Sequence, residues 1–249
     1  MMAILLAAGV GSRLQPYTQG IPKPLVPLGF HGGRIKVVAE RLLEQVKNSG
    51  ITDVVFVVNH KKEAIMDYFG NGSRFGVNAL YCFQEELNGD AGGIYLLKNH
   101  LKETFLVLDA DNYYEDDEVF KKVIEYHKKH KASATVAMTK VQDTRKYAIM
   151  KVEGDKVRDL VEKPLENPKW NNDAKLGIFV FEPSALFKYG QEIALSEQGS
   201  FSTTQILKSL SQKGNDVRAV KIEGHFTDIG TWDRYQEFQE WLLKHGRKV

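Results

Sequence analysis

Short apolar runs alternate along this chain with stretches whose apolar residues recur at helical spacing. Residues 2–6, 53–58 and 104–108 are short continuous apolar runs, which predicts strands buried on both faces of a sheet. Residues 35–49 have apolar positions three or four apart and are followed by Gly50, a pattern typical of an amphipathic helix with a glycine at its end. The two patterns in alternation predict an α/β fold with a mostly parallel sheet covered on both faces.

The same patterns continue through the middle of the chain. They predict helices at residues 61–69, 92–101 and 116–130, and strands at residues 77–83 and 132–140. No apolar run approaches the roughly 20 residues that a membrane-spanning helix needs. We therefore expect no membrane association.

The pattern changes after residue 140. Residues 147–152 and 156–161 flank Glu153-Gly154-Asp155, which predicts an antiparallel hairpin inserted into the fold. The remaining elements are a strand at 176–181, a helix at 201–213, a strand at 216–222 and a helix at 233–243. Because no linker or repeat interrupts the series, we expect residues 1–249 to form a single doubly wound domain.

Composition narrows the class of partner. The net charge is +2 and no basic block is clustered, so nucleic acid is not expected as a partner. The single cysteine, Cys82, excludes an internal disulfide and a cysteine-based zinc site, and it fits a reducing compartment. These features predict a cytoplasmic enzyme that acts on small molecules.

Candidate chemistry begins where the first strand ends, at Ala7-Ala8-Gly9-Val10-Gly11. Glycines reach backbone angles closed to other residues, so their N–H groups can line a nest for an oxyanion such as phosphate. Arg13 and Lys23 follow, and Lys23 is held between two prolines. A dinucleotide-binding fingerprint would require a third glycine where Leu14 stands, and no P-loop run occurs in the chain. This stretch therefore predicts a phosphate site of another kind.

The whole stretch resembles the N-terminal signature of the sugar-phosphate nucleotidylyltransferases, L-A-x-G-x-G-[ST]-R-L-x-P-x-T followed by P-K-P-L-x-P. Every element of that signature is present: Leu6, Ala7, Gly9, Gly11, Ser12, Arg13, Leu14, Pro16, Thr18, Pro22, Lys23, Pro24, Leu25 and Pro27. The resemblance implies a Rossmann-like nucleotidyltransferase fold. It also implies an enzyme that makes a nucleotide-sugar and pyrophosphate from a nucleoside triphosphate and a sugar 1-phosphate. The nucleotide-binding residues implied at this end of the chain are Leu6, Ala8, Gly9, Gly11, Ser12, Arg13 and Lys23.

Carboxylates follow the strand at residues 104–108, in the run Asp109-Ala110-Asp111-Asn112. Ligands bind at this end of the strands in open α/β sheets. We expect only one of Asp109 and Asp111 to face the ligand. The resemblance assigns that role to Asp111, and it matches Asp228 to the family's late D-x-G-[TS]-[WP] motif. It thereby implies a Mg²⁺ ion held by Asp111 and Asp228.

The acceptor side is implied by shorter matches. Glu162-Lys163-Pro164 resembles the family's E-K-P, in which the glutamate contacts sugar hydroxyls and the lysine contacts the sugar phosphate. Asn172 matches the sugar-binding N-x-A-x-x-G, and Tyr147 stands where the family has an aromatic residue against the sugar. The resemblance therefore assigns catalysis to a set of five charged residues: Arg13, Lys23, Asp111, Lys163 and Asp228.

Gln84 and Gly89 fall where uridylyl- and thymidylyltransferases of this family read the base. An amide offers a donor and an acceptor together, which suits the imide edge of uracil or thymine. UTP or dTTP is thus the favoured nucleotide, and the resemblance favours glucose 1-phosphate as the acceptor.

Two alternatives stay open. Ala110 stands in place of the family's glycine, and the run DADNY also resembles the choline-phosphate cytidylyltransferases, which would use CTP and phosphocholine. The second alternative is a non-catalytic regulatory relative that binds nucleotide-sugars. Such a protein would not need both Asp111 and Asp228. The sequence leaves the oligomeric state, including a homo-oligomer, undecided.

Overall fold

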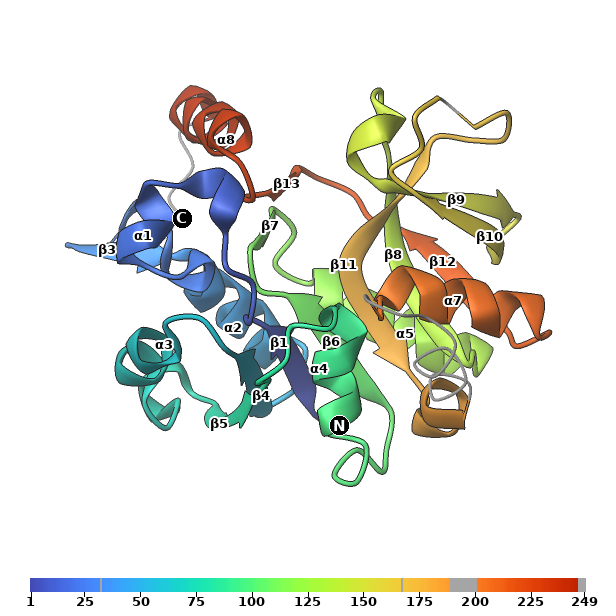
Figure 1. The fold of residues 1–249 in the computed structure, drawn as a ribbon, viewed down its shortest axis with the longest axis horizontal. Helices are drawn as coiled ribbons and strands as arrows, with labels where there is room; N and C mark the ends of the chain where they lie inside the picture. Colours follow the sequence, from blue (N-terminus) through green and yellow to red (C-terminus); the bar gives the residue numbers. More distant parts are fainter. Residues whose placement is uncertain (32, 167, 189–200, 246–249) are drawn as a thin grey trace.

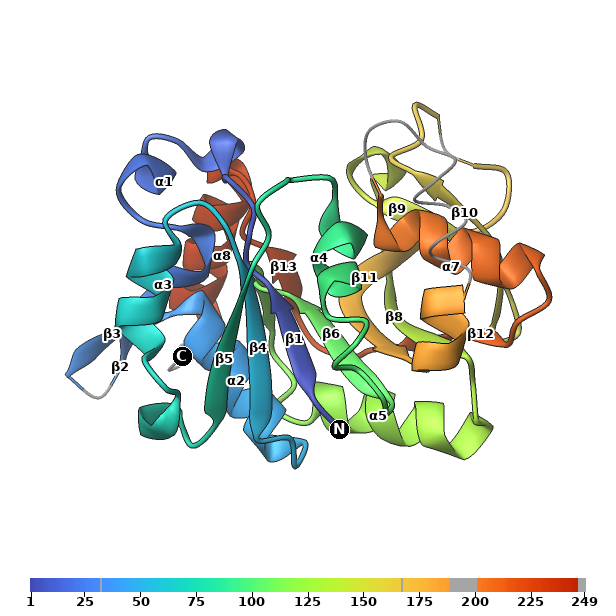
Figure 2. The same ribbon diagram turned by 60° about the horizontal axis from the view of Figure 1, so that its bottom comes forward.

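The structure, a computed structural model, describes residues 1–31, 33–166, 168–188 and 201–245. Its helices lie on both sides of a central sheet (Figures 1 and 2). The strands are β1 Ala3–Leu6, β2 Pro27–His31, β3 Arg34–Val37, β4 Asp53–Val58, β5 Asn78–Phe83, β6 Phe105–Asp109, β7 Asn112–Tyr114, β8 Ala134–Lys140, β9 Ala148–Glu153, β10 Lys156–Glu162, β11 Asp173–Phe181, β12 Val217–Lys221 and β13 Phe226–Asp228. The labelled helices are α1 Tyr17–Gly20, α2 Val38–Asn48, α3 Lys62–Phe69, α4 Asp90–Leu96, α5 Val119–His130, α7 Thr203–Gln212 and α8 Trp232–His245, with 3₁₀ turns at Ser12–Leu14, Lys23–Leu25, Ser73–Phe75 and Thr144–Lys146.

The main sheet has nine strands in the order β5-β4-β1-β6-β11-β8-β12-β10-β9. Strands β5, β4, β1 and β6 are parallel, whereas β11 runs antiparallel to both of its neighbours, β6 and β8. Strands β9 and β10 form the antiparallel hairpin predicted from the sequence. The predicted α/β class is confirmed: four parallel strands form one side of a mixed sheet, and β8 and β12 are a further parallel pair.

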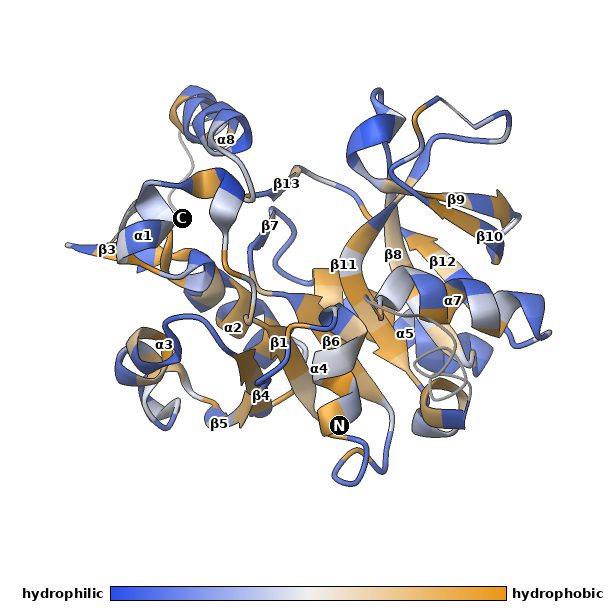
Figure 3. Ribbon diagram, in the orientation of Figure 1, coloured by the Kyte–Doolittle hydropathy of each residue, from blue (hydrophilic) through white to orange (hydrophobic). Residues whose placement is uncertain are grey.

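The central strands are apolar because both of their faces are buried. In β4, Val54, Phe56 and Val58 face one core together with α2 and α5, while Val55 and Val57 face a second core together with α4 and α7. Figure 3 shows the result, with hydrophobic strands in the middle and hydrophilic stretches along the outer helices. Each face buries its own set of alternate side chains, as the period of a strand requires.

Several boundaries differ from the prediction. Residues 34–37 form β3 and not the first turn of a helix, because they pair with β2, which leaves Ile35 exposed. Helix α4 starts at Asp90 and ends at Leu96, earlier at both ends than expected. An added Cβ on Gly93 would lie 2.7 Å from Val57, so this glycine lets the helix pack closely on β4. Strand β11 begins three residues before the predicted start.

The sequence analysis did not predict a small antiparallel ladder between β7 and β13. It pairs Asn112 with Asp228 and Tyr114 with Phe226. Each strand has three residues, too few for a periodic pattern to reveal. Helix α8 follows at once and buries Phe238 and Leu242 in a third core.

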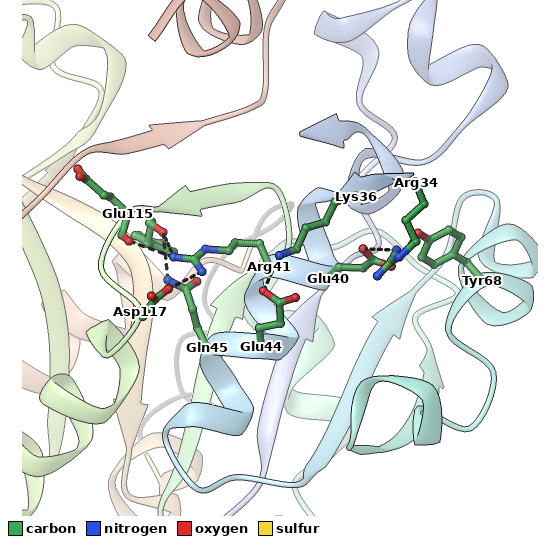
Figure 4. Close-up of polar contacts among 10 residues, drawn as sticks. Arg34, Lys36, Glu40, Arg41, Glu44, Gln45, Tyr68, Glu115 and Asp117 are labelled. Atoms are coloured by element: carbon green, nitrogen blue, oxygen red, sulfur yellow. Dashed lines mark hydrogen bonds and ion pairs between the residues drawn. The ribbon is translucent and has the colours of Figure 1, made fainter. Parts of the chain in front are cut away.

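Polar side chains of α2 hold the chain just after β7 (Figure 4). Gln45 Nε2 donates to the carbonyl oxygens of Tyr114 and Asp116 at 3.0 and 2.7 Å, and Arg41 donates to the carbonyl oxygen of Glu115 at 3.0 Å. An ion pair between Arg41 and Asp117 extends this contact. Helix α2 therefore fixes the segment that follows the Asp111–Asn112 turn.

A second polar cluster ties α2 to α3 and to β3 (Figure 4). Glu40 is 1% exposed, and it accepts hydrogen bonds from Arg34 Nη1 at 2.6 and 2.8 Å and from the Tyr68 hydroxyl at 2.9 Å. Burial, followed by the neighbouring Glu40, raises the pKa of Tyr68 to about 12.

None of the helices in the described residues combines the length and hydrophobicity of a bilayer span.

We expect Glu40→Gln to destabilise the protein by about 1–3 kcal/mol, because a buried acceptor of three hydrogen bonds loses its charge and one acceptor atom. Equilibrium unfolding in urea measures the change. Glu63→Gln is the matched control, since Glu63 is 71% exposed in its pair with Lys62 and should shift stability by less than about 0.5 kcal/mol. Equal unfolding midpoints for the two variants would contradict the role of Glu40.

Candidate functional site

A cavity of about 420 Å³ opens at the carboxyl ends of β1, β4 and β6. Strand β1 lies where the strand order reverses, the position at which open α/β sheets bind ligands. The lining residues are Leu6, Ala8, Gly9, Arg13, Val57, Gln84, Leu87, Gly89, Asp90, Asp109, Asp111, Asn112 and Asp228. A smaller cavity of about 40 Å³ shares Leu6, Gly9 and Asp111 with it and adds Lys23.

The loop after β1 has the backbone geometry that its glycines allow. Gly11 has a φ of 73°, in the left-handed region, and its carbonyl oxygen accepts a hydrogen bond from Thr18 Oγ1 at 2.8 Å. A Cβ at Gly11 would lie 2.9 Å from Thr18 Cγ2, so both the angle and the space require glycine. Gly11 and Ser12 do not line the cavity, but the 3₁₀ turn that Ser12 begins carries Arg13 to it.

Backbone pairing brings two distant aspartates together. The β7–β13 ladder sets Asn112 opposite Asp228, and the N–H of Ile229 donates to the carbonyl oxygen of Asp111 at 2.9 Å. Both carboxylates line the cavity. The ladder therefore builds an acidic pair from two segments that are remote in the chain.

Each aspartate of this pair is held by a cation. Lys23 Nζ lies 2.7 Å from Asp111 Oδ2, and Arg234 Nη1 forms an ion pair with Asp228 Oδ2. Burial alone would raise the pKa of Asp111, but the charge of Lys23 and its hydrogen bond outweigh burial and lower it. The same contact raises the pKa of Lys23. Burial, followed by the nearby charge of Asp111, raises the pKa of Asp228.

The donor set of the acidic pair fits Mg²⁺. Magnesium takes one or two carboxylates together with water and substrate phosphate oxygens. Within the described residues, no group of three or more His, Cys, Asp or Glu side chains is arranged to hold a metal ion. Asp111 and Asp228 would therefore need oxygens from a substrate to complete a magnesium site.

The expectation that Asp109 faces away from the ligand is wrong. Residues two apart along a strand lie on the same face, and Asp109, the last residue of β6, lines the cavity together with Asp111. Burial raises the pKa of Asp109 to about 7, and the charge of Lys175 partly opposes this rise. The Asp109 carboxylate lies against the backbone of Gly177, where an added Cβ would collide with it.

Gln84 and Gly89 also line the cavity. Gln84 is 4% exposed, and its Nε2 donates to Asn88 Oδ1 at 3.1 Å and to the carbonyl oxygen of Gly89 at 3.0 Å. Among the hydrogen bonds of the described residues, none uses Gln84 Oε1. The amide is thus held firmly with its oxygen available as an acceptor.

The acceptor-side residues suggested by the sequence lie outside this cavity. Glu162 Oε2 accepts a hydrogen bond from Thr204 Oγ1 at 2.8 Å. Lys163 has a 54% exposed side chain, 3.9 Å from Glu162. The exposed Asn172 side chain donates to the carbonyl oxygen of Val141. The centroid of the Tyr147 ring lies 4.9 Å from the Arg234 guanidinium carbon, and Arg234 pairs with Asp228.

The sequence analysis did not single out Arg234, Asp90 or Asn112 as site residues. Asn112 adjoins Asp111, and a buried asparagine directly after a strand is a usable signal. Asp90 accepts hydrogen bonds from the backbone N–H and the hydroxyl of Thr203, at 2.9 and 2.6 Å, so its role depends on a contact across the fold. Arg234 could be found only by knowing that α8 starts at Trp232 and turns this side chain toward Asp228.

Comparisons with known proteins agree with this geometry. The family model described as nucleotidyl transferase matches residues 2–245. The bifunctional protein GlmU of Methanococcus maripaludis (strain C5) is 31% identical over 251 residues, which cover all of this chain and 56% of that protein. The low-salt glycan biosynthesis nucleotidyltransferase Agl11 of Haloferax volcanii is 30% identical over 98% of this chain and 66% of Agl11. The chain thus spans little more than half of the first of these relatives.

Two solved structures have the same fold. A Bacillus anthracis protein assigned as a glucose-1-phosphate thymidylyltransferase, in complex with a sucrose, superimposes with a TM-score of 0.86 at 26% identity, over 100% of this chain and 97% of that one. A UDP-glucose pyrophosphorylase complexed with UDP-glucose gives 0.83 at 22% identity, over 98% of each chain, and supports the fold alone. Taken with the family match over residues 2–245, the resemblance read from the sequence is confirmed: this chain belongs to the nucleotidyl transferase family.

Proposed function

We propose that the protein is a magnesium-dependent nucleotidylyltransferase that joins a nucleoside triphosphate, UTP or dTTP, to a sugar 1-phosphate, with glucose 1-phosphate favoured. The observation that carries the proposal is the Asp111–Asp228 pair on the wall of a cavity that Gly9 and Arg13 also line. Phosphate-binding groups and a metal-binding acidic pair on one cavity are what the transfer of a nucleotidyl group requires.

The reaction forms one P–O bond and breaks another at the same phosphorus. An oxygen of the sugar 1-phosphate attacks the α-phosphorus in line and forms a new P–O bond, while the bond from that phosphorus to the β-phosphate oxygen breaks and pyrophosphate leaves. The attacking oxygen is already an anion at neutral pH, so it needs no general base. The protein then has to bring two anions together and hold them in line.

The roles follow from where the charged groups lie. The glycine loop, Arg13 and Lys23 lie along the cavity wall next to the acidic pair, in reach of a triphosphate. Lys163, on the exposed side of the hairpin, would meet the phosphate of the acceptor. Mg²⁺ bound by Asp111 and Asp228 would screen the charge of the phosphate oxygens.

A second acceptor, phosphocholine with CTP, is favoured by one specific observation. Asp109 places a carboxylate in the cavity with no hydrogen-bonding partner among the described residues. A carboxyl group there suits a cationic headgroup, whose charge would favour its ionised form, as well as it suits sugar hydroxyls. Release of pyrophosphate from CTP and phosphocholine, without release from any sugar 1-phosphate, would favour this acceptor.

The base preference is tested by measuring pyrophosphate release from UTP, dTTP, CTP, ATP and GTP with glucose 1-phosphate. We expect UTP or dTTP to be preferred by about tenfold or more, because Gln84 Oε1 can accept from an imide N–H that the other bases lack in that position. Gln84→Glu should abolish this preference, whereas Gln212→Glu, at the exposed end of α7, should keep it. Comparable turnover with GTP would contradict the assignment of Gln84 as the residue that selects uracil or thymine.

Arg13→Ala should lower kcat/KM by about two orders of magnitude, since a positioned cation facing developing charge stabilises the transition state by about 3 kcal/mol. Steady-state pyrophosphate release measures the loss. Arg74→Ala changes an exposed arginine near α3 and should behave like the wild type. A near-normal rate for folded Arg13→Ala would show that this loop does not hold the triphosphate.

The acidic pair is tested with Asp111→Asn, Asp228→Asn and the double variant, in titrations of pyrophosphate release against magnesium concentration. Each single variant should lose activity by about two orders of magnitude or more and need more magnesium, because a carboxylate ligand has lost its charge. The double variant should be little worse than either, since residues that act as one unit are not additive. Asp53→Asn, at the opposite end of β4, is the control. Independent, additive losses would argue against a shared ion.

A further inference from the structure

Arg234 is a cation at the site to which the proposed reaction gives no role. It lies in the first turn of α8 and its side chain is 12% exposed. Its Nη1 pairs with Asp228 Oδ2, one atom of the acidic pair. An arginine buried to this extent on a cavity-lining carboxylate has given up most of its hydration for one partner.

The charges around the acidic pair change when a divalent cation arrives. Asp111 is paired with Lys23 and Asp228 with Arg234, while Arg13 lines the same cavity. A divalent cation bound at Asp228 would compete with Arg234 for this carboxylate and would repel the guanidinium. Arg234 then needs another anion close by, since an unpaired buried charge is costly.

The position of Arg234 shows where that anion would be. The guanidinium carbon lies 4.9 Å from the centroid of the Tyr147 ring, just before β9 in the antiparallel half of the sheet. In Figure 1, α8 and β9 stand at opposite sides of the molecule with β13 between them, so this contact spans the gap. Tyr147 supports the guanidinium from one face by a cation–π contact and leaves its N–H edge for an oxyanion. The nearest proposed ligand on that side is the phosphate of the acceptor.

We propose that Arg234 binds the acceptor's phosphate once a divalent cation has displaced the guanidinium from Asp228. The inference rests on the proposed function, because it assigns a residue to the acceptor of that reaction. A guanidinium suits this task since its planar fork can donate two parallel hydrogen bonds to one phosphate. The Asp228 carboxylate would thus pair first with Arg234 and then with the divalent cation.

The kinetic experiment compares the wild type with Arg234→Gln, Arg234→Lys and the control Arg158→Gln, an exposed arginine on β10. We expect Arg234→Gln to raise the KM for glucose 1-phosphate by about tenfold or more, with the KM for the nucleotide within about twofold of wild type, because only the acceptor loses charge-assisted hydrogen bonds. Arg234→Lys should recover part of the loss, and Arg158→Gln should match the wild type. A rise in the nucleotide KM alone, or no rise in either, would overturn the inference.

Calorimetry on the protein without nucleotide gives a readout independent of turnover. Arg234→Gln should bind Mg²⁺ more tightly than the wild type, since the competitor for Asp228 is gone, and should bind inorganic phosphate in the presence of Mg²⁺ about tenfold more weakly. Tighter Mg²⁺ binding with unchanged phosphate binding would mean that Arg234 is only a counterion, and weaker Mg²⁺ binding would mean that it serves to orient Asp228. If the wild type released no pyrophosphate, the proposed reaction would fail, whereas these binding measurements would still decide the role of Arg234.

Discussion

Two carboxylates of like charge, Asp111 and Asp228, lie next to each other in a partly buried position, and the surrounding structure has to balance them. Burial and mutual repulsion both disfavour their charged forms. The fold answers with a cation on each, Lys23 from the loop after β1 and Arg234 from α8. The glycine loop, the β7–β13 ladder and the start of α8 therefore belong to one electrostatic arrangement.

Much of the fold could be read from the sequence because its signals are local. Buried parallel strands such as β4 are continuous runs of β-branched and aromatic residues, and the hairpin of β9 and β10 is marked by Glu153-Gly154-Asp155. The start of α2 could not be read in this way, because residues 34–37 satisfy a helical period yet pair with β2. Pairing with a distant partner overrides the local pattern.

The same contrast between local patterns and long-range contacts applies to the site residues. The glycine loop, Arg13 and Lys23 lie within one contiguous signature, so the sequence analysis singled them out together. Asp109 was misjudged because residues two apart along a strand share a face, so a continuing strand would already have placed it beside Asp111, and both line the cavity. Arg234 was missed because its meaning comes only from its contacts with Asp228 and Tyr147. A residue whose role arises from long-range contacts cannot be recognised from the spacing of motifs or apolar positions in the sequence.

The β7–β13 ladder also has a consequence for synthesis on the ribosome. One of its strands begins at Asn112 and the other at Phe226, so the first waits through the translation of β8 to β12 before its partner exists. During that interval the four parallel strands can already form, because their sequences are complete once β6 has emerged. The acidic pair cannot form until the C-terminal segment docks. The nascent chain can thus acquire a folded parallel half before its two carboxylates come together.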